Sequence, residues 1–531
     1  MGISKEQLIA EIERRRTFAI ISHPDAGKTT LTEKLLLYGG AIHMAGSVKA
    51  RKAAKYATSD WMEIEKQRGI SVTSSVMQFN YKNYCINILD TPGHQDFSED
   101  TYRTLVAADS AVMLIDGAKG VEAQTIKLFH VCKMRGIPIF TFINKMDRAS
   151  KDPFALMQEI EEVLGIQSCP INWPIGTDGD FKGVYNRKLK QIELFTSDNK
   201  HGQAIVGSTR GSVDDPVFKD LLGEHYHSRL VDEIELLDVA GDNFDLRKVL
   251  KGELTPIFFG SAITNFGVEP FLEEFLQMSP PPGPQAFNDK TVEPESEDFS
   301  GFIFKIQANM NPNHRDRLAF MRICSGVFER NMQVYHSSSG KMIRLSQPQQ
   351  LMAQERELVE VAYPGDIVGL FDPGIFRIGD ALSTSGNLTF SGIPSFPAEF
   401  FARVTAKDTM KRKQFLKGLT QLSEEGAIQI YKQPDIGIEE FITGAVGVLQ
   451  FEVLEYRLKN EYNVDLRLTH LNYGHARWIT ETPCDPHDLN KTSTTMIVKD
   501  MHDNYVLLFE NEWSIQWVLD RNKGLVLRDI S

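Results

Sequence analysis

The chain has 531 residues, which at about 150 residues per domain suggests three or four domains. With 42% hydrophobic and 24% charged residues, its composition is that of folded globular proteins and excludes wholesale disorder and fibrous repeats. The net charge of −13 argues against binding to nucleic acid through bulk positive charge, although local basic patches could still contact RNA.

The five cysteines lie far apart and include no Cys-x-x-Cys pair. This spacing excludes a disulfide framework and a cysteine zinc site, and it indicates a reducing compartment. The charged N-terminus is not followed by an apolar run long enough for a signal peptide, and no stretch approaches the ~18 apolar residues of a membrane helix. We therefore expect a cytoplasmic protein without membrane contact.

Short apolar strands alternate with amphipathic segments over roughly the first 280 residues. The expected strands are 18–22, 71–79, 86–90, 111–116, 137–144 and 256–261, and expected helices include 30–37, 121–135 and 268–277. Several strands are continuous apolar runs, which is typical of parallel strands buried on both faces. This alternation predicts an open, doubly wound α/β sheet.

Two further domains are expected after a proline-rich linker at 279–284. From about 299 to 385, short strands are separated by glycine-containing turns, which predicts a small antiparallel β-barrel. After Pro397 the order β-α-β-β-α-β predicts a ferredoxin-like α/β domain. Its expected elements are 400–406, 409–424, 427–431, 441–446, 448–460 and 464–468, and the tail after Leu468 is left unassigned.

A phosphate-binding loop follows the first strand and precedes a helix. Ser22 stands where the usual G-x-x-x-x-G-K-[ST] pattern begins with glycine. Gly27 would let the backbone approach a polyphosphate, Lys28 would reach its β- and γ-phosphates, and the Thr29 hydroxyl would bind Mg²⁺. A chance Gly-Lys-Thr is the alternative, which the strand–loop–helix context disfavours. The predicted loop residues are Ser22, His23, Pro24, Asp25, Ala26, Gly27, Lys28, Thr29 and Thr30.

The second element ends the strand at 86–90 and reads Asp90, Thr91, Pro92, Gly93, His94. An aspartate there can hold the Mg²⁺ shell, and the glycine N–H can bind a γ-phosphate and move when it leaves. An ordinary Asp-Thr-Pro-Gly turn is the alternative. The Ser71 hydroxyl would complete the Mg²⁺ shell only while a γ-phosphate is present; alone it reads as a serine at the start of a strand.

The third element reads Asn144, Lys145, Met146, Asp147, and Ser261 with Ala262 follows a later strand. The Asp147 carboxylate can accept hydrogen bonds from guanine N1–H and the 2-amino group, which adenine cannot offer. The backbone N–H at Ser261–Ala262 is placed to meet guanine O6. Because these elements each end a strand of an open α/β sheet, they converge at one edge and predict a GTP site.

With these motifs placed, the chain resembles the translational GTPases, and among them the class II peptide-chain release factors related to elongation factor G. The resemblance covers roughly residues 14–468 and is carried by RRRTFAIISHPDAGKTT, SDWMEIEKQRGIS, DTPGH, TFINKMDR, GFIFKIQANM and QLSEEGAIQ. The departures are mild: Ser or Ala in place of glycine at Ser22 recurs among the relatives that this chain resembles, and Ser71 replaces the threonine of elongation factors while keeping the hydroxyl.

The resemblance implies a multidomain α/β plus β protein that hydrolyses GTP to GDP with Mg²⁺ bound by Thr29, Ser71 and Asp90. It assigns His94 to the water that attacks the γ-phosphate. Its implied partners are the ribosome, through large-subunit rRNA and ribosomal proteins that stimulate turnover, and class I release factors, which it would dissociate after peptide release. We expect a monomer that binds neither DNA nor membrane.

The stretch between Asp147 and Ser261 is longer than a minimal GTPase needs, and elongation factor G carries an insert in the same place. The predicted boundaries are therefore 1–283 for the GTP-binding domain, with an insertion between about 165 and 253, then 284–391 for the β-barrel domain and 392–531 for the ferredoxin-like domain with its tail. A chain without two further domains favours release-factor recycling over translocation.

Three other readings stay open: an elongation-factor-G-like or other ribosome-associated GTPase, a GTP-dependent interaction module without significant turnover, and a P-loop ATPase or kinase acting on a small molecule. Two basic clusters are candidates for RNA contact, with a solvated helix or loop face as the alternative for each. They are Lys49, Arg51, Lys52 and Lys55, and then Lys407, Lys411, Arg412, Lys413 and Lys417.

Overall fold

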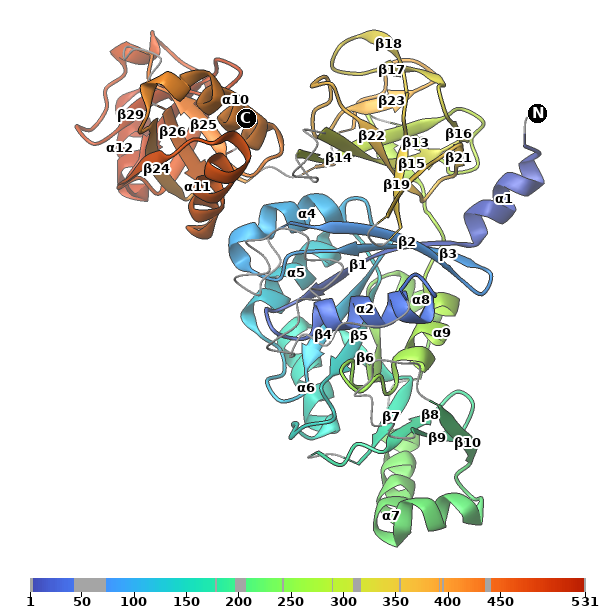
Figure 1. Cartoon of the computed structure of the whole chain (residues 1–531). Helices are drawn as coiled ribbons and strands as arrows, with labels where there is room; N and C mark the ends of the chain where they lie inside the picture. The colour runs from blue at the N-terminus through green and yellow to red at the C-terminus, as the bar shows by residue number, and fades with distance from the viewer. Residues whose placement is uncertain are drawn as a thin grey trace.

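A computed structural model shows three bodies: an α/β domain with an extension at the bottom of the view, a β-barrel at upper right, and a C-terminal α/β domain at upper left (Figure 1). The structure describes residues 3–42, 73–176, 179–195, 207–240, 243–288, 290–308, 317–352, 355–390, 392–393, 396–434 and 441–529. In this part of the chain, no helix is both long and apolar enough to cross a membrane.

The first body is a seven-stranded sheet of order β2-β3-β1-β4-β5-β11-β6. All neighbouring strands are parallel except β2, which pairs antiparallel with β3 at the edge. The strands are β1 Arg15–Ser22, β2 Ser75–Tyr81, β3 Tyr84–Asp90, β4 Ser110–Asp116, β5 Ile139–Asn144, β6 Gln167–Pro170 and β11 Leu254–Phe259. The expected doubly wound sheet is confirmed.

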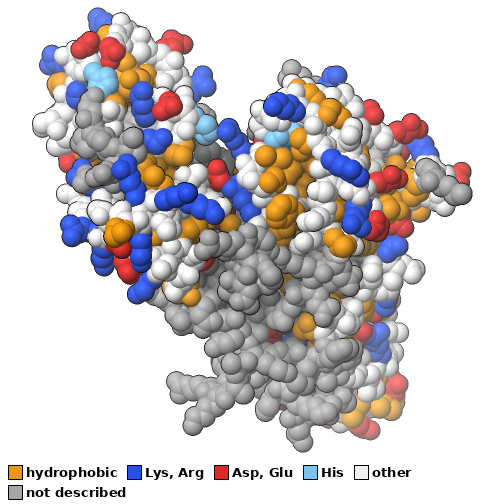
Figure 2. Space-filling view, turned by 45° about the horizontal axis from the view of Figure 1, so that its top comes forward, with side chains coloured by type: hydrophobic (Ala, Val, Ile, Leu, Met, Phe, Trp, Pro, Cys, Tyr) orange, Lys and Arg blue, Asp and Glu red, His pale blue; other side chains and the backbone are white. Residues whose placement is uncertain are grey.

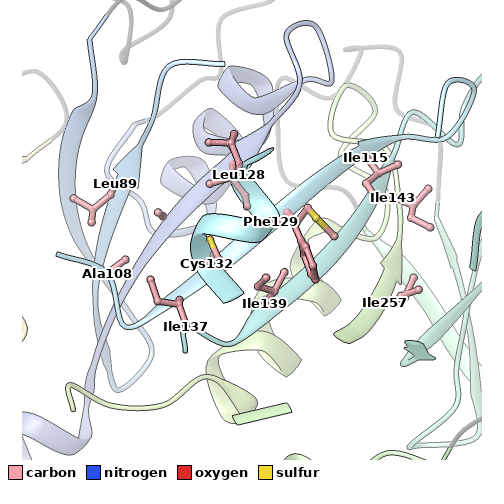
Figure 3. Close-up of a cluster of buried hydrophobic side chains, with 14 of the residues drawn as sticks. Leu89, Ala108, Ile115, Leu128, Phe129, Cys132, Ile137, Ile139, Ile143 and Ile257 are labelled. Atoms are coloured by element: carbon pink, nitrogen blue, oxygen red, sulfur yellow. The ribbon is translucent and has the colours of Figure 1, made fainter. Parts of the chain in front are cut away.

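Helices cover both faces of this sheet, which is why its strands read as continuous apolar runs. Side chains of α5, among them Leu128, Phe129 and Cys132, pack on one face (Figure 3). On the other face Phe271 of α9 lies 5.0 Å from Phe142 between ring centroids. The helices are α1 Lys5–Glu13, α2 Lys28–Tyr38, α4 Ser98–Leu105, α5 Ala123–Met134, α6 Pro153–Leu164, α8 Leu246–Leu250 and α9 Val268–Met278.

An extension lies between β6 and α8 in sequence. It holds an antiparallel sheet of order β10-β9-β8-β7 and the helix α7 Pro216–Ala240, which is interrupted at Gly223. Trp173 is fully buried there, and its indole N–H donates to Glu233 at 2.7 Å. The strands are β7 Asn172–Ile175, β8 Gly183–Asn186, β9 Gln191–Phe195 and β10 Ser208–Ser212. We propose that this extension is the insertion predicted between about 165 and 253.

The second body is antiparallel throughout, with strand order β18-β17-β23-β14-β15-β22-β19-β20 and a small pair β16-β21. It has its own core, in which Ile303, Met321 and Leu382 are fully buried. The β-barrel is confirmed. Its strands are β14 Ser300–Ala308, β15 Arg317–Ser325, β16 Phe328–Glu329, β17 Gln333–His336, β18 Lys341–Arg344, β19 Gln349–Met352, β20 Glu355–Leu358, β21 Val361–Ala362, β22 Ile367–Phe371 and β23 Ala381–Ser383, preceded by the hairpin β12 Gln285–Phe287 and β13 Lys290–Val292.

The third body begins with the expected β-α-β-β-α-β order, and its strands pair antiparallel as β27-β24-β26-β25. The ferredoxin-like module is confirmed. Its elements are β24 Phe400–Ala406, the short helix η2 Thr409–Lys411, α10 Arg412–Glu424, β25 Gln429–Lys432, β26 Phe441–Ala445, α11 Leu449–Tyr462 and β27 Leu466–Leu471.

The tail left unassigned by the sequence continues the same sheet as β29-β30-β28-β31, joined to β25 at the pair Lys432 and Lys499. Its elements are β28 His475–Glu481, η3 Pro486–Asp488, β29 Met496–Lys499, β30 Tyr505–Phe509, α12 Glu512–Arg521 and β31 Val526–Arg528. We call the body from β24 to β31 the C-terminal domain.

A turn of the barrel is inserted against β1, β2 and β3 of the first body. The Asp366 carboxylate accepts from Arg15 at 2.9 Å and from Gln78 at 2.9 Å, and the Gly365 carbonyl accepts from the Thr17 hydroxyl at 2.7 Å. Burial disfavours the charged guanidinium of Arg15, but the Asp366 carboxylate together with Cys85 and Glu11 outweighs burial and raises the pKa of Arg15. These contacts fix the barrel to the α/β domain.

Gly365→Ala should loosen this junction. Gly365 has φ +100°, and a Cβ atom there would collide with the Pro282 ring, whereas Gly374 has φ +99° and open space around it. Both alanines carry the strain of positive φ, so the difference between them isolates the collision. We expect Gly365→Ala to cost about 1–3 kcal/mol more than Gly374→Ala. Thermal unfolding of the two variants measures this; equal melting temperatures would mean that the junction can relax.

Candidate active site

The loops at the carboxyl edge of the sheet meet because β1, β3, β4, β5 and β11 run parallel. Ligands in open α/β sheets bind at this edge. The predicted loops after β1, β3, β5 and β11 all lie there, so the structure brings together the separate sequence motifs. The loop after β4, which the sequence reading did not assign to the site, joins them.

The loop after β1 has the backbone of an anion-binding turn. Asp25 has φ 65° and Gly27 has φ 99°, and such left-handed positions turn successive N–H groups to one side. The helix α2 begins at Lys28, and its N-cap residue Gly27 makes no side-chain cap, so α2 presents uncapped N–H groups to this loop. Thr29 and Thr30 lie in the first turn of α2.

Gly27 is also needed for packing. A Cβ atom there would collide with the amide nitrogen of Asn144, a residue that arrives from β5. That amide donates to the Ala26 carbonyl at 2.8 Å, so the phosphate loop and the base loop are in direct contact. Ser22 ends β1 and is buried, while His23 and Pro24 are half-buried at the edge.

The loop after β3 lies beside the phosphate loop. The Lys28 ammonium donates to the Asp90 carboxylate, and both side chains are buried, at 7% and 1% exposed. The Thr91 hydroxyl donates to the Ile20 carbonyl at 2.7 Å, and a Cβ at Gly93 would stand only 3.5 Å from Pro24. The Pro92 carbonyl accepts from Thr101 of α4 at 3.1 Å, which ties this loop to the next helix.

His94 caps the short helix η1 Gln95–Phe97. Its Nδ1 accepts from the Asp96 backbone N–H at 3.2 Å, and its side chain is 29% exposed. His94 therefore directly follows Gly93 and is partly exposed. Ser71 and the basic residues Lys49, Arg51, Lys52 and Lys55 lie outside the described residues.

Two side chains hold the loops after β5 and β11, which form the predicted base side of the site. Asn144 Oδ1 accepts from the Ala262 N–H at 2.8 Å, so this amide joins the loops after β1, β5 and β11. The Ser261 hydroxyl donates to Asp147 Oδ1 at 2.6 Å and orients that carboxylate. Met146 is fully buried in the core and its N–H donates to Gly260 O at 3.2 Å, so its side chain serves packing.

Asp116 belongs to the site although the sequence reading missed it. The Lys145 ammonium donates to Asp116 at 2.7 Å and also to the Asp25 carbonyl. Burial would raise the pKa of Asp116, but hydrogen bonds from Lys145 and the Ala118 N–H outweigh it and lower that pKa. Lys145 is thereby held across the base side. The available signal was an Asp-Gly pair at the carboxyl end of a buried parallel strand.

These residues fit a guanine nucleotide. The edge offers uncapped helix N–H groups and one lysine for phosphates, and an oriented carboxylate beside two backbone-fixed loops for a purine. Among the described residues, no group of three His, Cys, Asp or Glu side chains could hold a metal ion. A single aspartate with a threonine hydroxyl is the donor set that suits Mg²⁺ bound largely by water and phosphate oxygens.

The fold and this edge define the chain as a multidomain GTP-binding protein of the translational GTPase class. Family models match in the same order: elongation factor Tu GTP binding domain over residues 13–281, elongation factor G domain 2 over 298–385, and class II release factor RF3, C-terminal domain, over 390–519. The chain belongs to the peptide chain release factor 3 family, whose function is translation termination.

Three relatives named peptide chain release factor 3 illustrate the likeness. The protein of Symbiobacterium thermophilum is 62% identical, over 98% of this chain and 99% of the relative. That of Synechocystis is 54% identical over 97% and 94%, and that of Listeria monocytogenes is 53% identical over 99% and 99%. A crystal structure of a protein from Thermus thermophilus has a TM-score of 0.69 at 20% identity, covering 92% of this chain and 72% of that one, which shows a shared fold.

Proposed function

We propose that this chain is a ribosome-stimulated GTPase that promotes dissociation of class I release factors from the ribosome after the peptide has been released. The observation that carries the proposal is the joining of the base loop to the phosphate loop through Asn144, with Asp147 oriented beside it and His94 one residue past Gly93. Such an arrangement would suit both guanine selection and hydrolysis.

In this proposal the N-terminus of α2 and Lys28 hold the phosphates, and Lys28 exchanges its contact with Asp90 for them. Thr29 and Asp90, with Ser71, would hold Mg²⁺, which neutralises charge on the phosphates. His94 orients a water molecule toward the γ-phosphate. Phosphoryl transfer depends mainly on positioning and charge stabilisation, so loops fixed by buried hydrogen bonds suit it.

The ribosome is the proposed activator, and the C-terminal domain offers a surface for it. Lys and Arg side chains are numerous over that domain (Figure 2). Lys407, Arg412, Lys413 and Lys417 are exposed around the start of α10. Such a patch can contact RNA phosphates although the whole chain is acidic. We propose that the protein acts as a monomer in the cytoplasm.

Ribosomes should raise GTP turnover at least about a hundredfold over the intrinsic rate, because positioning groups supplied by an activator have effects of that size. Purified ribosomes carrying a labelled class I factor after peptide hydrolysis should lose that factor with GTP. The measurements are phosphate release with and without ribosomes, and retention of the factor with GTP or a non-hydrolysable analogue. If ribosomes leave GTP turnover unchanged, or if the class I factor stays bound under both conditions, the proposal is wrong.

A further inference from the structure

Asp96 makes contacts in two directions, two residues after His94. One contact is with the His94 ring and the other is with the C-terminal domain. The Asp96 side chain is only 11% exposed, so both contacts are made away from bulk solvent.

On the C-terminal side, Asp96 Oδ2 accepts from the Leu449 N–H, the first residue of α11, at 2.7 Å. The helix has Val448 at its N-cap and no side-chain cap of its own, so the carboxylate from the first body supplies one. Gly447 precedes it, and a Cβ atom there would collide with Asp96. The approach of the two bodies is therefore close and depends on a glycine.

On the catalytic side, His94 Nδ1 lies 3.2 Å from the Asp96 backbone N and 3.3 Å from Asp96 Oδ1. The backbone N–H donates to Nδ1, and the Asp96 carboxylate lies beside the same nitrogen. Asp96 thus holds one edge of the imidazole through its backbone and its side chain.

The surrounding contacts make Asp96 part of one interface. Arg103 of α4 donates to the Gly426 carbonyl of the C-terminal domain at 3.2 Å, and the Tyr102 and Phe396 rings lie 4.7 Å apart between centroids. Arg103 and Tyr102 belong to the helix that follows η1. The segment after His94 is thus the docking face for the C-terminal domain.

We propose that Asp96 is a positioning residue that couples His94 to the docking of the C-terminal domain. Docking holds the carboxylate through Leu449, and the carboxylate with its backbone N–H holds the ring. When the domains separate, the ring loses this fixed partner. Movement of the C-terminal domain on the ribosome would then directly change the orientation of His94, the residue that orients water. This inference rests on the proposed role of His94.

Asp96→Ala should lower ribosome-stimulated kcat at least about tenfold, since small misplacements of a positioning group have large effects. The dissociation constant for GTP and the ribosome concentration at half-maximal rate should stay within about twofold. Asp96→Asn should restore most of the rate, because its amide oxygen can still accept from Leu449 and the side chain keeps its place beside the ring. An Asn variant as slow as the Ala variant would contradict the positioning role.

Gly447→Ala tests the C-terminal half of the link without altering Asp96. It should lower kcat comparably, and the double variant should be no slower than the slower single one, because both break one connection. Gly474→Ala is the matched control, since a Cβ there stands 3.5 Å from Glu510 O, an ordinary contact, and it should keep the full rate. Additive losses would overturn the coupling.

A readout independent of turnover separates this inference from the proposed function. With ¹³C labelling of histidine Cε1, the His94 signal is identified by its loss in His94→Ala. It should shift in Asp96→Ala and Gly447→Ala but not in Gly474→Ala. A signal unmoved by Gly447→Ala rejects the coupling even if ribosomes stimulate turnover. Absence of ribosome stimulation with these shifts present rejects only the proposed function.

Discussion

Asp147→Asn should convert the protein from GTP to xanthosine triphosphate as preferred nucleotide. The carboxylate of Asp147 is oriented by Ser261 at 2.6 Å, and we propose that it accepts from guanine N1–H and the 2-amino group. An asparagine amide meets that amino group with a donor, whereas it can donate to the 2-oxo group of xanthine. The hydrogen bond from the 2-amino group is replaced by two facing donors, and the one from N1–H loses its charged acceptor. A cost of about 3 kcal/mol corresponds to a loss of about a hundredfold or more in GTP affinity.

Equilibrium binding of GTP, xanthosine triphosphate and ATP to both proteins measures this change. Asp152→Asn is the matched control, because Asp152 caps α6 through the Phe154 N–H and asparagine caps a helix equally well. It removes the same charge a few residues away and should leave GTP affinity unchanged. If ATP binds the unmutated chain as tightly as GTP, the assignment of the base loop is wrong.

The first body was predictable because its signals are local. The apolar run expected at 137–144 is the strand Ile139–Asn144, buried on both faces, and the amphipathic segment expected at 268–277 is the helix Val268–Met278. Phe271 and Phe275 at helical spacing pack on the sheet through Phe142 and Phe140. Because parallel strands bring their carboxyl ends together, the positions of Asp90, Asn144 and Ser261 followed from the strand order alone.

The tail was not predictable because its pairing is not local. The strand β29 joins β25 at Lys432 and Lys499, and the sheet order β29-β30-β28-β31 departs from chain order. The pairing of short strands that are far apart in sequence is not encoded in a local hydrophobic period, so it cannot be predicted from the sequence pattern. The same holds for Asp116 and Asp96, whose roles come from tertiary contacts with Lys145 and Leu449.

The two halves of the site differ in how they are held, and this difference bears on mechanism. Asn144, Asp147 and Ser261 are joined by hydrogen bonds of 2.6–2.8 Å within one body. His94 instead lies on a loop whose next residues contact the C-terminal domain. Nucleotide binding should therefore be insensitive to domain arrangement, whereas turnover should depend on it.

His94→Ala should separate these two properties. Removing the ring takes away the group proposed to orient the attacking water, so ribosome-stimulated turnover should fall about a hundredfold or more, the range seen for positioned acid–base groups. Among the described residues, the His94 ring contacts its own turn through Asp96 and makes no contact with the phosphate or base loops. GTP affinity should therefore stay within about twofold. His130→Ala, on the exposed face of α5, is the matched control and should change neither. Single-turnover phosphate release and nucleotide titration on the same preparations measure the two properties. If the His94→Ala protein hydrolyses GTP at the unmutated rate, another residue must orient the water.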